Sequence, residues 1–191
     1  MEIVNNIVKV TSYKHIYVPI ALILDTRLSV GARFMWVYIA SLQTGTIKAD
    51  AFDSGISISN LSRYSYADEL ERCGWLCVSR VSASPIHSMR YELKENQKRI
   101  TECPGKMCCA RVILNCRLLS CGARLTYFVL RSVRRFDNGY IKITQTWLGV
   151  NRNTAIKYIN ELGSARLVRR FGRRFELRSP SCFTAPRDMN Q

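Results

Sequence analysis

The sequence predicts an α+β protein, mainly α with small β-hairpins, built from two copies of one small domain. Three observations indicate this fold class: a set of short motifs occurs twice, the same order of helical and strand patterns follows each set, and positive charge is concentrated in the second half of the chain. With 191 residues, 47% of them hydrophobic, the chain is long enough for two small domains that each bury a core.

The repeat is visible in two places. The segments "ILDTRLSVGAR" (23–33) and "ILNCRLLSCGAR" (113–124) share Ile-Leu, Arg-Leu, Ser and Gly-Ala-Arg in the same order, with Leu119 as a one-residue insertion. Farther along, Tyr-x-x-Glu-Leu occurs at 66–70 and again at 158–162. Copies spaced about 90 residues apart indicate a duplicated domain, because the units of solenoid proteins are much shorter.

The boundary between the copies is predicted in the polar segment 94–106, which contains Pro104-Gly105 and is typical of a linker. We therefore expect an N-terminal domain over residues 1–97 and a C-terminal domain over residues 98–178. The remaining segment, 179–191, has two prolines and no hydrophobic periodicity, so we expect a disordered tail.

Each copy begins with a helix, predicted over residues 29–42 or 120–134, in which an N-cap serine precedes apolar residues at helical spacing. A short helix, a turn at Gly55 or Gly149 and a second amphipathic helix follow. Two short strands then complete each copy; they are predicted over 76–81 and 89–93 in the first copy and over 167–171 and 174–178 in the second.

A short helix, a glycine turn, a second helix and a β-hairpin follow one another in the order of a winged helix-turn-helix domain. The segment "LGVNRNTAIKYINEL" (148–162) resembles the turn and recognition helix of that family, and "ERCGWLCVSR" (71–80) resembles its passage into the wing. The segment "YVPIALILDTRLSVGAR" (17–33) is similar to the first-helix region of phage and plasmid replication or regulatory proteins of this class. The resemblance implies two tandem winged-helix domains and DNA binding.

The formal net charge is +15, and its distribution favours a polyanionic partner. Residues 1–100 hold 12 Lys or Arg and 9 Asp or Glu, whereas residues 101–191 hold 17 and 5. A half-chain this basic is typical of proteins that bind nucleic acids. A basic surface that only aids solubility does not need such asymmetry, so we expect the second copy to bind double-stranded DNA.

The helix that begins after Asn151 is predicted to pack Ala155, Ile159 and Leu162 against its own domain, because these residues share one face at 3.6 residues per turn. The opposite face is polar, which fits either an ordinary solvated surface or DNA recognition. Amide side chains can pair with the major-groove edge of adenine, and lysine or arginine can bind guanine or phosphate. The DNA-binding residues predicted on this helix are Arg152, Asn153, Thr154, Lys157 and Asn160.

The hairpin after this helix is predicted to form an arginine-rich wing. Gly172 allows its turn, and Phe171 and Phe175 are expected to anchor it while guanidinium groups project from its tip. Arginine suits such a wing because its planar fork binds phosphate oxygens in pairs and its charge is attracted to a narrow minor groove. The DNA-binding residues predicted on the wing are Arg169, Arg170, Arg173 and Arg174.

The first copy is predicted to be a degenerate version that serves association or partner binding. Its second helix carries Asp68, Glu69 and Glu71, which would repel a DNA backbone. Arg63 falls on the inward side of that helix, so we expect the helix to be irregular or to start late. The wing of this copy, 81–88, has no basic residue.

Nothing in the sequence indicates an enzyme, a catalytic residue or a cofactor. The chain has two histidines and lacks a glycine-rich phosphate loop and paired carboxylates. Five of the eight cysteines fall between Cys103 and Cys121 without the paired C-x2-C spacing of structural zinc sites. We interpret them as reduced, buried apolar side chains, with a zinc or iron–sulfur site as the alternative.

We expect a cytoplasmic protein without a membrane partner, because no segment approaches the roughly 20 apolar residues of a membrane span and the first residues lack a signal-peptide pattern. The expected function is sequence-specific binding of double-stranded DNA, as a transcriptional regulator of a phage, plasmid or other mobile element. A second copy of the chain and a host protein are further candidate partners. The alternatives are a plasmid or phage replication initiator and a mobile-element protein that inhibits or adapts a host protein or ribonucleoprotein complex.

Overall fold

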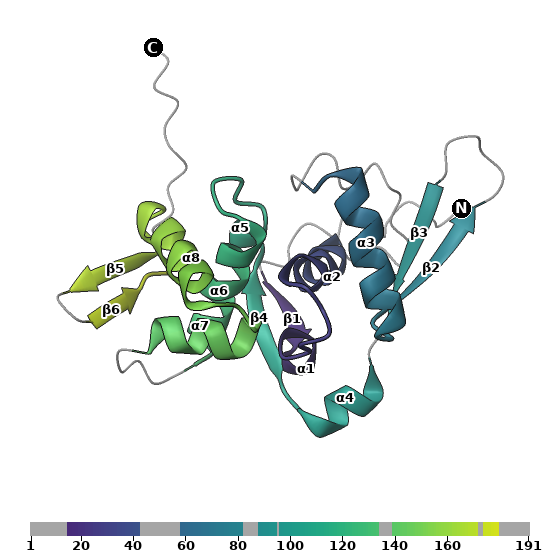
Figure 1. Ribbon diagram of the computed structural model, residues 1–191, viewed down its shortest axis with the longest axis horizontal. Helices are drawn as coiled ribbons and strands as arrows, with labels where there is room; N and C mark the ends of the chain where they lie inside the picture. Colours follow the sequence, from purple (N-terminus) through teal and green to yellow (C-terminus); the bar gives the residue numbers. More distant parts are fainter. Residues whose placement is uncertain are drawn as a thin grey trace, which may run out of the picture. The chain divides into compact units, whose positions relative to one another are not determined.

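The computed structural model describes residues 15–42, 58–81, 88–94, 96–133, 139–171 and 174–179 (Figure 1). The chain divides into two compact units, Met1–Asn115 (unit 1) and Cys116–Gln191 (unit 2). Helices and two-stranded antiparallel sheets confirm the α+β class.

The elements of unit 1 are β1 (His15–Pro19), α1 (Ile20–Ile23), α2 (Val30–Leu42), α3 (Asn60–Arg72), β2 (Leu76–Val81), β3 (Ser88–Leu93), α4 (Gln97–Glu102), β4 (Lys106–Ala110) and α5 (Arg111–Leu114). Those of unit 2 are α6 (Cys121–Ser132), α7 (Tyr140–Leu148), α8 (Arg152–Ser164), β5 (Val168–Phe171) and β6 (Arg174–Leu177).

Most elements recur in the same order along the chain, although α4 and α7 have no counterpart among the described residues. β1, α1 and α2 begin 91 residues before β4, α5 and α6, and α3 and β2 begin 92 residues before α8 and β5. The turn into each hairpin uses a left-handed residue at the equivalent place, Gly74 (φ 74°) and Arg166 (φ 58°). Because the spacing from β1 to α2 equals that from β4 to α6, the predicted insertion at Leu119 is wrong.

The predicted helices and hairpins agree with the structure to within a few residues. Ser29 and Ser120 stand before α2 and α6, and their hydroxyls accept hydrogen bonds from the N–H groups of Ala32 and Ala123 at 3.1 and 3.3 Å. Most residues of both helices are buried, including the equivalent arginines Arg33 on α2 and Arg124 on α6. The predicted short helix and turn before Gly55 lie outside the described residues, and so does most of the wing predicted over 81–88.

A tyrosine and a glycine set the distance between the two main helices of each repeat. The ring of Tyr66 on α3 lies over Gly31 on α2, and that of Tyr158 on α8 lies over Gly122 on α6. A Cβ atom at Gly31 or Gly122 would lie 2.2 or 2.0 Å from the Cζ atom of the tyrosine. No side chain fits in that space, so glycine is required for the helices to pack this closely.

The glutamate of the shared Tyr-x-x-Glu-Leu motif is structural. Glu69 accepts a hydrogen bond from the backbone N–H of Ser29 at 2.7 Å, and Glu161 accepts one from that of Ser120 at 3.0 Å. A carboxylate at a helix N-terminus also interacts favourably with the helix dipole. Glu69 was expected to repel a DNA backbone. Its equivalent in the basic copy, Glu161, makes the same hydrogen bond, so this glutamate does not distinguish the first copy from the second.

Arg63 does not disturb the helix that carries it. It is buried at the position where α8 has Ala155, yet α3 is regular from Asn60 and its N-cap Ser59 accepts a hydrogen bond from the N–H of Ser62 at 3.2 Å. The expectation of an irregular or late-starting helix is wrong. Its long aliphatic stem lets the inward arginine pack within the unit.

Strands β1 and β4 occupy equivalent positions in the two repeats and pair with each other (Figure 1). The antiparallel register runs from His15 opposite Ala110 to Pro19 opposite Lys106, with Tyr17 opposite Cys108 at the centre. Because Tyr17 and Cys108 are themselves equivalent positions, the ribbon has local two-fold symmetry. This pairing draws β4 and α5 into unit 1, which therefore extends past the boundary predicted at residue 97.

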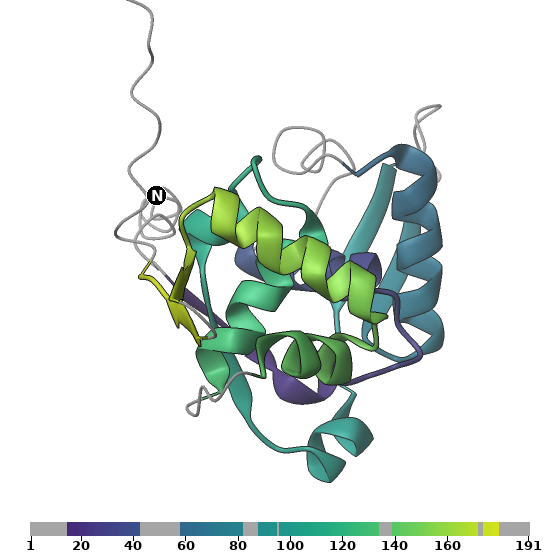
Figure 2. The ribbon, with the colours of Figure 1, turned by 60° about the vertical axis from the view of Figure 1, so that its left-hand side comes forward.

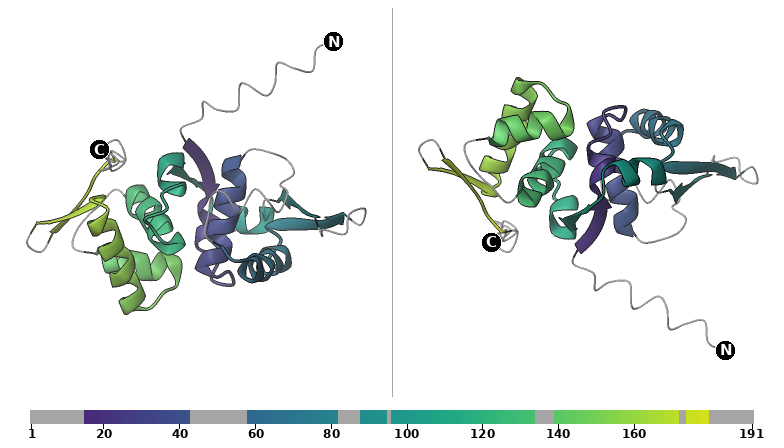
Figure 3. Two further views of the ribbon diagram at one scale, coloured as in Figure 1. Left: turned by 90° about the horizontal axis from the view of Figure 1, so that it is seen from above. Right: turned by 90° about the horizontal axis from the view of Figure 1, so that it is seen from below.

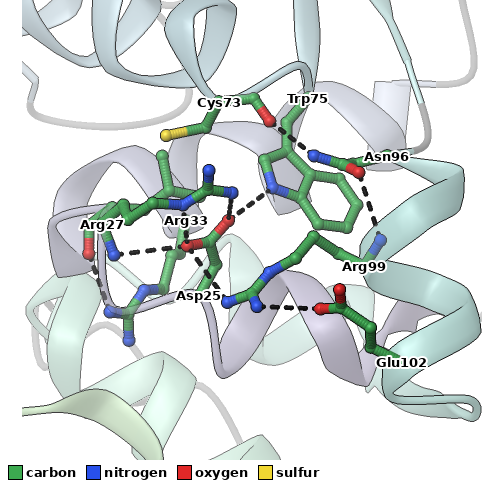
Figure 4. A network of polar contacts seen from close by, with 9 residues as sticks. Asp25, Arg27, Arg33, Cys73, Trp75, Asn96, Arg99 and Glu102 are labelled. Carbon is green, nitrogen blue, oxygen red and sulfur yellow. Dashed lines mark hydrogen bonds and ion pairs between the residues drawn. The ribbon is translucent and has the colours of Figure 1, made fainter.

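The predicted linker 94–106 contains the helix α4, and a buried carboxylate holds it in unit 1 (Figure 4). Asp25 is fully buried and accepts hydrogen bonds from Nε and a terminal nitrogen of Arg27, at 2.8 and 2.7 Å, and from the indole N–H of Trp75, at 3.0 Å. A guanidinium nitrogen of Arg99 on α4 lies 3.6 Å from the same carboxylate. The N-cap residue Asn96 donates to the backbone carbonyl of Cys73 at 2.7 Å. The first contact joins α4 to the segment between α1 and α2, and the second joins it to the turn between α3 and β2.

The environment of Asp25 keeps its carboxylate charged. Burial alone would raise its pKa, but the hydrogen bonds from Arg27 and Trp75 outweigh burial and lower the pKa from 3.8 to about 2. A folded-state pKa below the ordinary value means that the charged network stabilises the fold above about pH 4. That stabilisation is lost as the pH falls from about 4 to about 2.

Gly122→Ala is expected to lower the free energy of unfolding by about 1–3 kcal/mol, because the new methyl group would collide with the Tyr158 ring. Gly163→Ala is the matched control. Gly163 is helical and exposed, and a Cβ atom there would come no closer than 3.9 Å to a neighbour, so this change should stabilise α8 by about 0.5–1 kcal/mol. Urea unfolding of the two variants measures both effects. Equal effects of the two alanines would contradict the packing described for Gly122.

Asp25→Asn is expected to lower the free energy of unfolding at pH 7 by about 1–3 kcal/mol, because charge-assisted hydrogen bonds are lost in a buried place. The difference from the wild type should shrink between pH 4 and pH 2, where Asp25 itself becomes protonated. Urea unfolding across this pH range measures the difference. Asp68→Asn, at an exposed position, is the control and should leave stability unchanged; a D25N deficit that stays constant down to pH 2 would refute the assignment.

Candidate nucleic-acid interface

The turn between α7 and α8 is built as the sequence predicts. α7 ends at Gly149, which adopts the left-handed conformation (φ 64°) that disfavours other residues. Asn151 then caps α8 by accepting a hydrogen bond from the N–H of Thr154 at 2.8 Å. The helices α6, α7 and α8 pack on one another within unit 2 (Figure 2). This packing fixes which face of α8 is exposed.

The two faces of α8 agree with the prediction from helical spacing. Ala155, Ile159 and Leu162 are buried. The predicted DNA-binding residues of the helix lie on the other side: Arg152, Asn153, Lys157 and Asn160 are exposed, and Thr154 is half-buried at the capped end. The helix therefore presents two amides and two cations along its outer face.

A groove along α8 is lined in part by Leu118, a residue that the sequence analysis did not predict at this surface. Leu118, in the segment before α6, is 68% exposed and lies beside the outer face of α8. We call this depression, with a volume of about 670 Å³, the α8 groove. Its lining residues are Leu118, Asn153, Ile156, Lys157, Asn160, Glu161, Ser164 and Ala165. An exposed leucine 35 positions before Asn153 gives no periodic signal, so only the folded structure reveals its proximity.

The hairpin of β5 and β6 carries exposed arginines, but they do not form one cluster. Arg169 stands opposite Glu176 and Arg170 opposite Phe175, and both arginines are exposed. Successive residues of a strand point to opposite faces. Arg169 and Arg170 therefore point to opposite faces of the hairpin, which corrects the expectation that all the guanidinium groups project together. Arg174 lies in β6, whereas Gly172 and Arg173 lie outside the described residues.

Aromatic residues fix the hairpin to the helices of unit 2, from which it extends (Figure 3). The ring of Phe175 lies 5.2 Å from that of Tyr140 on α7, and the Tyr140 hydroxyl donates to the Phe175 carbonyl at 3.0 Å. The Tyr127 hydroxyl on α6 donates to the carbonyl of Arg178 at 2.9 Å. The anchoring role predicted for Phe175 is confirmed, and the guanidinium carbon of Arg170 lies 6.0 Å from the centre of the same ring.

The predicted cysteine cluster is spread over several elements. Cys109 and Cys116 are buried, as interpreted, and burial raises the pKa of the Cys109 thiol well above its usual value. Cys103, Cys108 and Cys121 are half-buried. Among the residues that the structure describes, no group of three or more His, Cys, Asp or Glu side chains is placed to hold a metal ion. Within the same ranges, no helix combines the length and apolar character that crossing a membrane requires.

Comparison with known proteins gives no further guide to this surface. No protein-family model, curated protein or solved structure matches the chain.

Proposed function

We propose that the chain is a sequence-specific double-stranded-DNA-binding protein that acts as a transcriptional regulator through unit 2. The observation that carries this proposal is the outer face of α8, where Arg152, Asn153, Lys157 and Asn160 are exposed on a helix that is capped, packed and preceded by a tight glycine turn. Such an arrangement is typical of the recognition helix of a helix-turn-helix domain. The hairpin that follows α8 supports a winged version of it.

The residue types on α8 suit the major groove of DNA, which is wide enough to admit an α-helix. The amides of Asn153 and Asn160 can each bind the two adjacent groups of an adenine edge. Lys157 and Arg152 can bind a guanine edge or a phosphate. The single carboxylate that lines the α8 groove, that of Glu161, accepts a hydrogen bond from the backbone of Ser120, so its charge is partly compensated within unit 2.

The hairpin supplies charge at a fixed distance from α8, since β5 packs on α8 and Phe175 is fixed to α7. Exposed Arg169 and Arg170 point to opposite faces of the hairpin. One of them is therefore suited to contact a phosphate of the DNA backbone beside α8, and the other adds positive charge that attracts the duplex. Phosphate contacts of this kind position a protein on the duplex without selecting the sequence.

A regulator and a replication initiator of a phage or plasmid would use the same interface. They differ in the arrangement of their sites: a regulator protects one operator, whereas an initiator protects an array of repeats at an origin. Footprinting on the DNA that flanks the gene distinguishes them, and a regular array of protected sites would favour the initiator.

Unit 1 supports a second function, contact with a protein. On α3, Leu61 and Tyr64 are 82% and 37% exposed and Asp68 is exposed, at the positions where α8 has Asn153, Ile156 and Asn160. An apolar and acidic face is unsuited to DNA and fits a protein surface. We propose that this face mediates self-association or binds a host protein.

Lys157→Ala is expected to weaken duplex binding and to reduce the slope of log K against log salt by about one, because one phosphate or base contact is lost. Lys98→Ala removes the same charge from an exposed position on α4 and serves as the control. Fluorescence anisotropy from 50 to 300 mM salt measures both. A flat salt dependence of the wild type, or equal losses in the two variants, would contradict the proposal.

Leu61→Lys is expected to abolish association with a protein partner while duplex affinity changes by less than about twofold, since α3 is proposed to lie outside the DNA interface. Sedimentation of the pure protein tests self-association, and co-purification tests a host partner. Lys157→Ala provides the reciprocal control, with normal association and weakened DNA binding. Loss of DNA binding alone in the Leu61 variant would assign the α3 face to DNA instead.

A further inference from the structure

The α8 groove has an apolar wall and a polar wall. Leu118, 68% exposed, and half-exposed Ile156 form the apolar wall from two separate segments of unit 2. Asn153, Lys157 and Asn160 form the polar wall along α8. Because Leu118 and Ile156 adjoin each other beside a polar helix face, the groove offers apolar and hydrogen-bonding contacts together, which points to a ligand with both kinds of group.

We infer that the α8 groove recognises A·T base pairs, with the asparagine amides on adenine and the side chains of Leu118 and Ile156 on the methyl group of thymine. This inference rests on the proposed function, because it names the base pairs that the proposed interface selects. In the major groove, adenine presents N7 and the N6 amino group while thymine presents O4 and its C5 methyl group. One A·T edge therefore offers both hydrogen-bonding and apolar partners to the two walls.

The composition of the groove also disfavours G·C pairs. Arginine and lysine are the side chains that bind guanine, and the lining residues include no arginine and one lysine, Lys157, against the two amides of Asn153 and Asn160. Recognition of cytosine uses a carboxylate that accepts from its N4 amino group. The one carboxylate in the groove is that of Glu161, and one of its oxygens already accepts from the Ser120 N–H at 3.0 Å.

The equivalent surface of the first repeat has different chemistry. Where α8 has Asn153, Lys157 and Asn160, α3 has Leu61, Ser65 and Asp68. The residues that hold the helices together are, by contrast, the same in both repeats. The amides are therefore specific to the α8 groove, and so is Leu118, whose equivalent in the first repeat is Arg27.

The test begins with selection of bound duplexes from a random pool by the full-length protein. A·T pairs are expected at the positions that the protein protects. Each thymine of the selected duplex is then replaced by deoxyuridine, which removes only the methyl group. At one or two positions the wild type should bind about fourfold more weakly, the equivalent of one buried methyl group.

Leu118→Ala should bind the thymine and deoxyuridine duplexes with equal affinity at one of those positions, because the side chain that contacts the methyl group is gone. Val112→Ala is the control: it also shortens an exposed apolar side chain, at a position outside both the α8 groove and the α3 face, and it should keep the wild-type discrimination. Circular dichroism of both variants checks that they are folded. Asn160→Ala should in turn lose the preference for adenine at a neighbouring position.

The outcomes separate this inference from the proposed function. A selected motif rich in G·C, or a wild type that tolerates deoxyuridine at every position, would overturn the inference while leaving DNA binding intact. Equal discrimination by the wild type and Leu118→Ala would likewise overturn the role of Leu118. Failure to enrich any duplex would overturn the proposed function itself.

Discussion

The contact between a tyrosine ring and a glycine backbone, made once in each repeat, is the constraint on which the rest of the structure depends. Tyr66 on Gly31 and Tyr158 on Gly122 set how closely the outer helix approaches the buried one. A glutamate one turn farther along then reaches the N-terminus of the buried helix. Together, the two contacts fix the distance of the outer helix from the buried helix and its rotation about its own axis. They therefore also determine which residues the outer helix exposes.

This constraint explains why the two copies can share a framework and differ in their surfaces. The repeated motifs are the residues of the helix contact, and these determine the fold. The outward positions of α3 and α8 make no contribution to that contact, so they are free to differ, as Leu61 and Asn153 do. A sequence comparison of the copies thus identifies the framework, whereas the differences between them indicate function.

Much of the fold could be predicted from the sequence because its signals are local. Helical spacing, serine caps and glycine turns predicted α2, α3, α6, α7, α8 and the two hairpins, and also the inward and outward faces of α8. The pairing of β1 with β4 could not be predicted, since each strand has five residues and its partner is 91 residues away. The position of Leu118 beside α8 was missed because the two are far apart in the sequence and share no helical spacing. The inward position of Arg63 was predicted, but the regular helix around it was not, because a buried arginine interrupts the apolar pattern of the helix.

The pairing of β1 with β4 has a consequence for the order in which the protein acquires its structure. When a ribosome has released residues 15–94, the residues of α2, α3 and the first hairpin have emerged, but β4, the strand that pairs with β1, has not. The cost of closing so long a loop rises only with the logarithm of its length, so the delay does not prevent pairing. The first copy thus remains incomplete until β4 has been synthesised, which makes the first half of the chain dependent on the start of the second during translation.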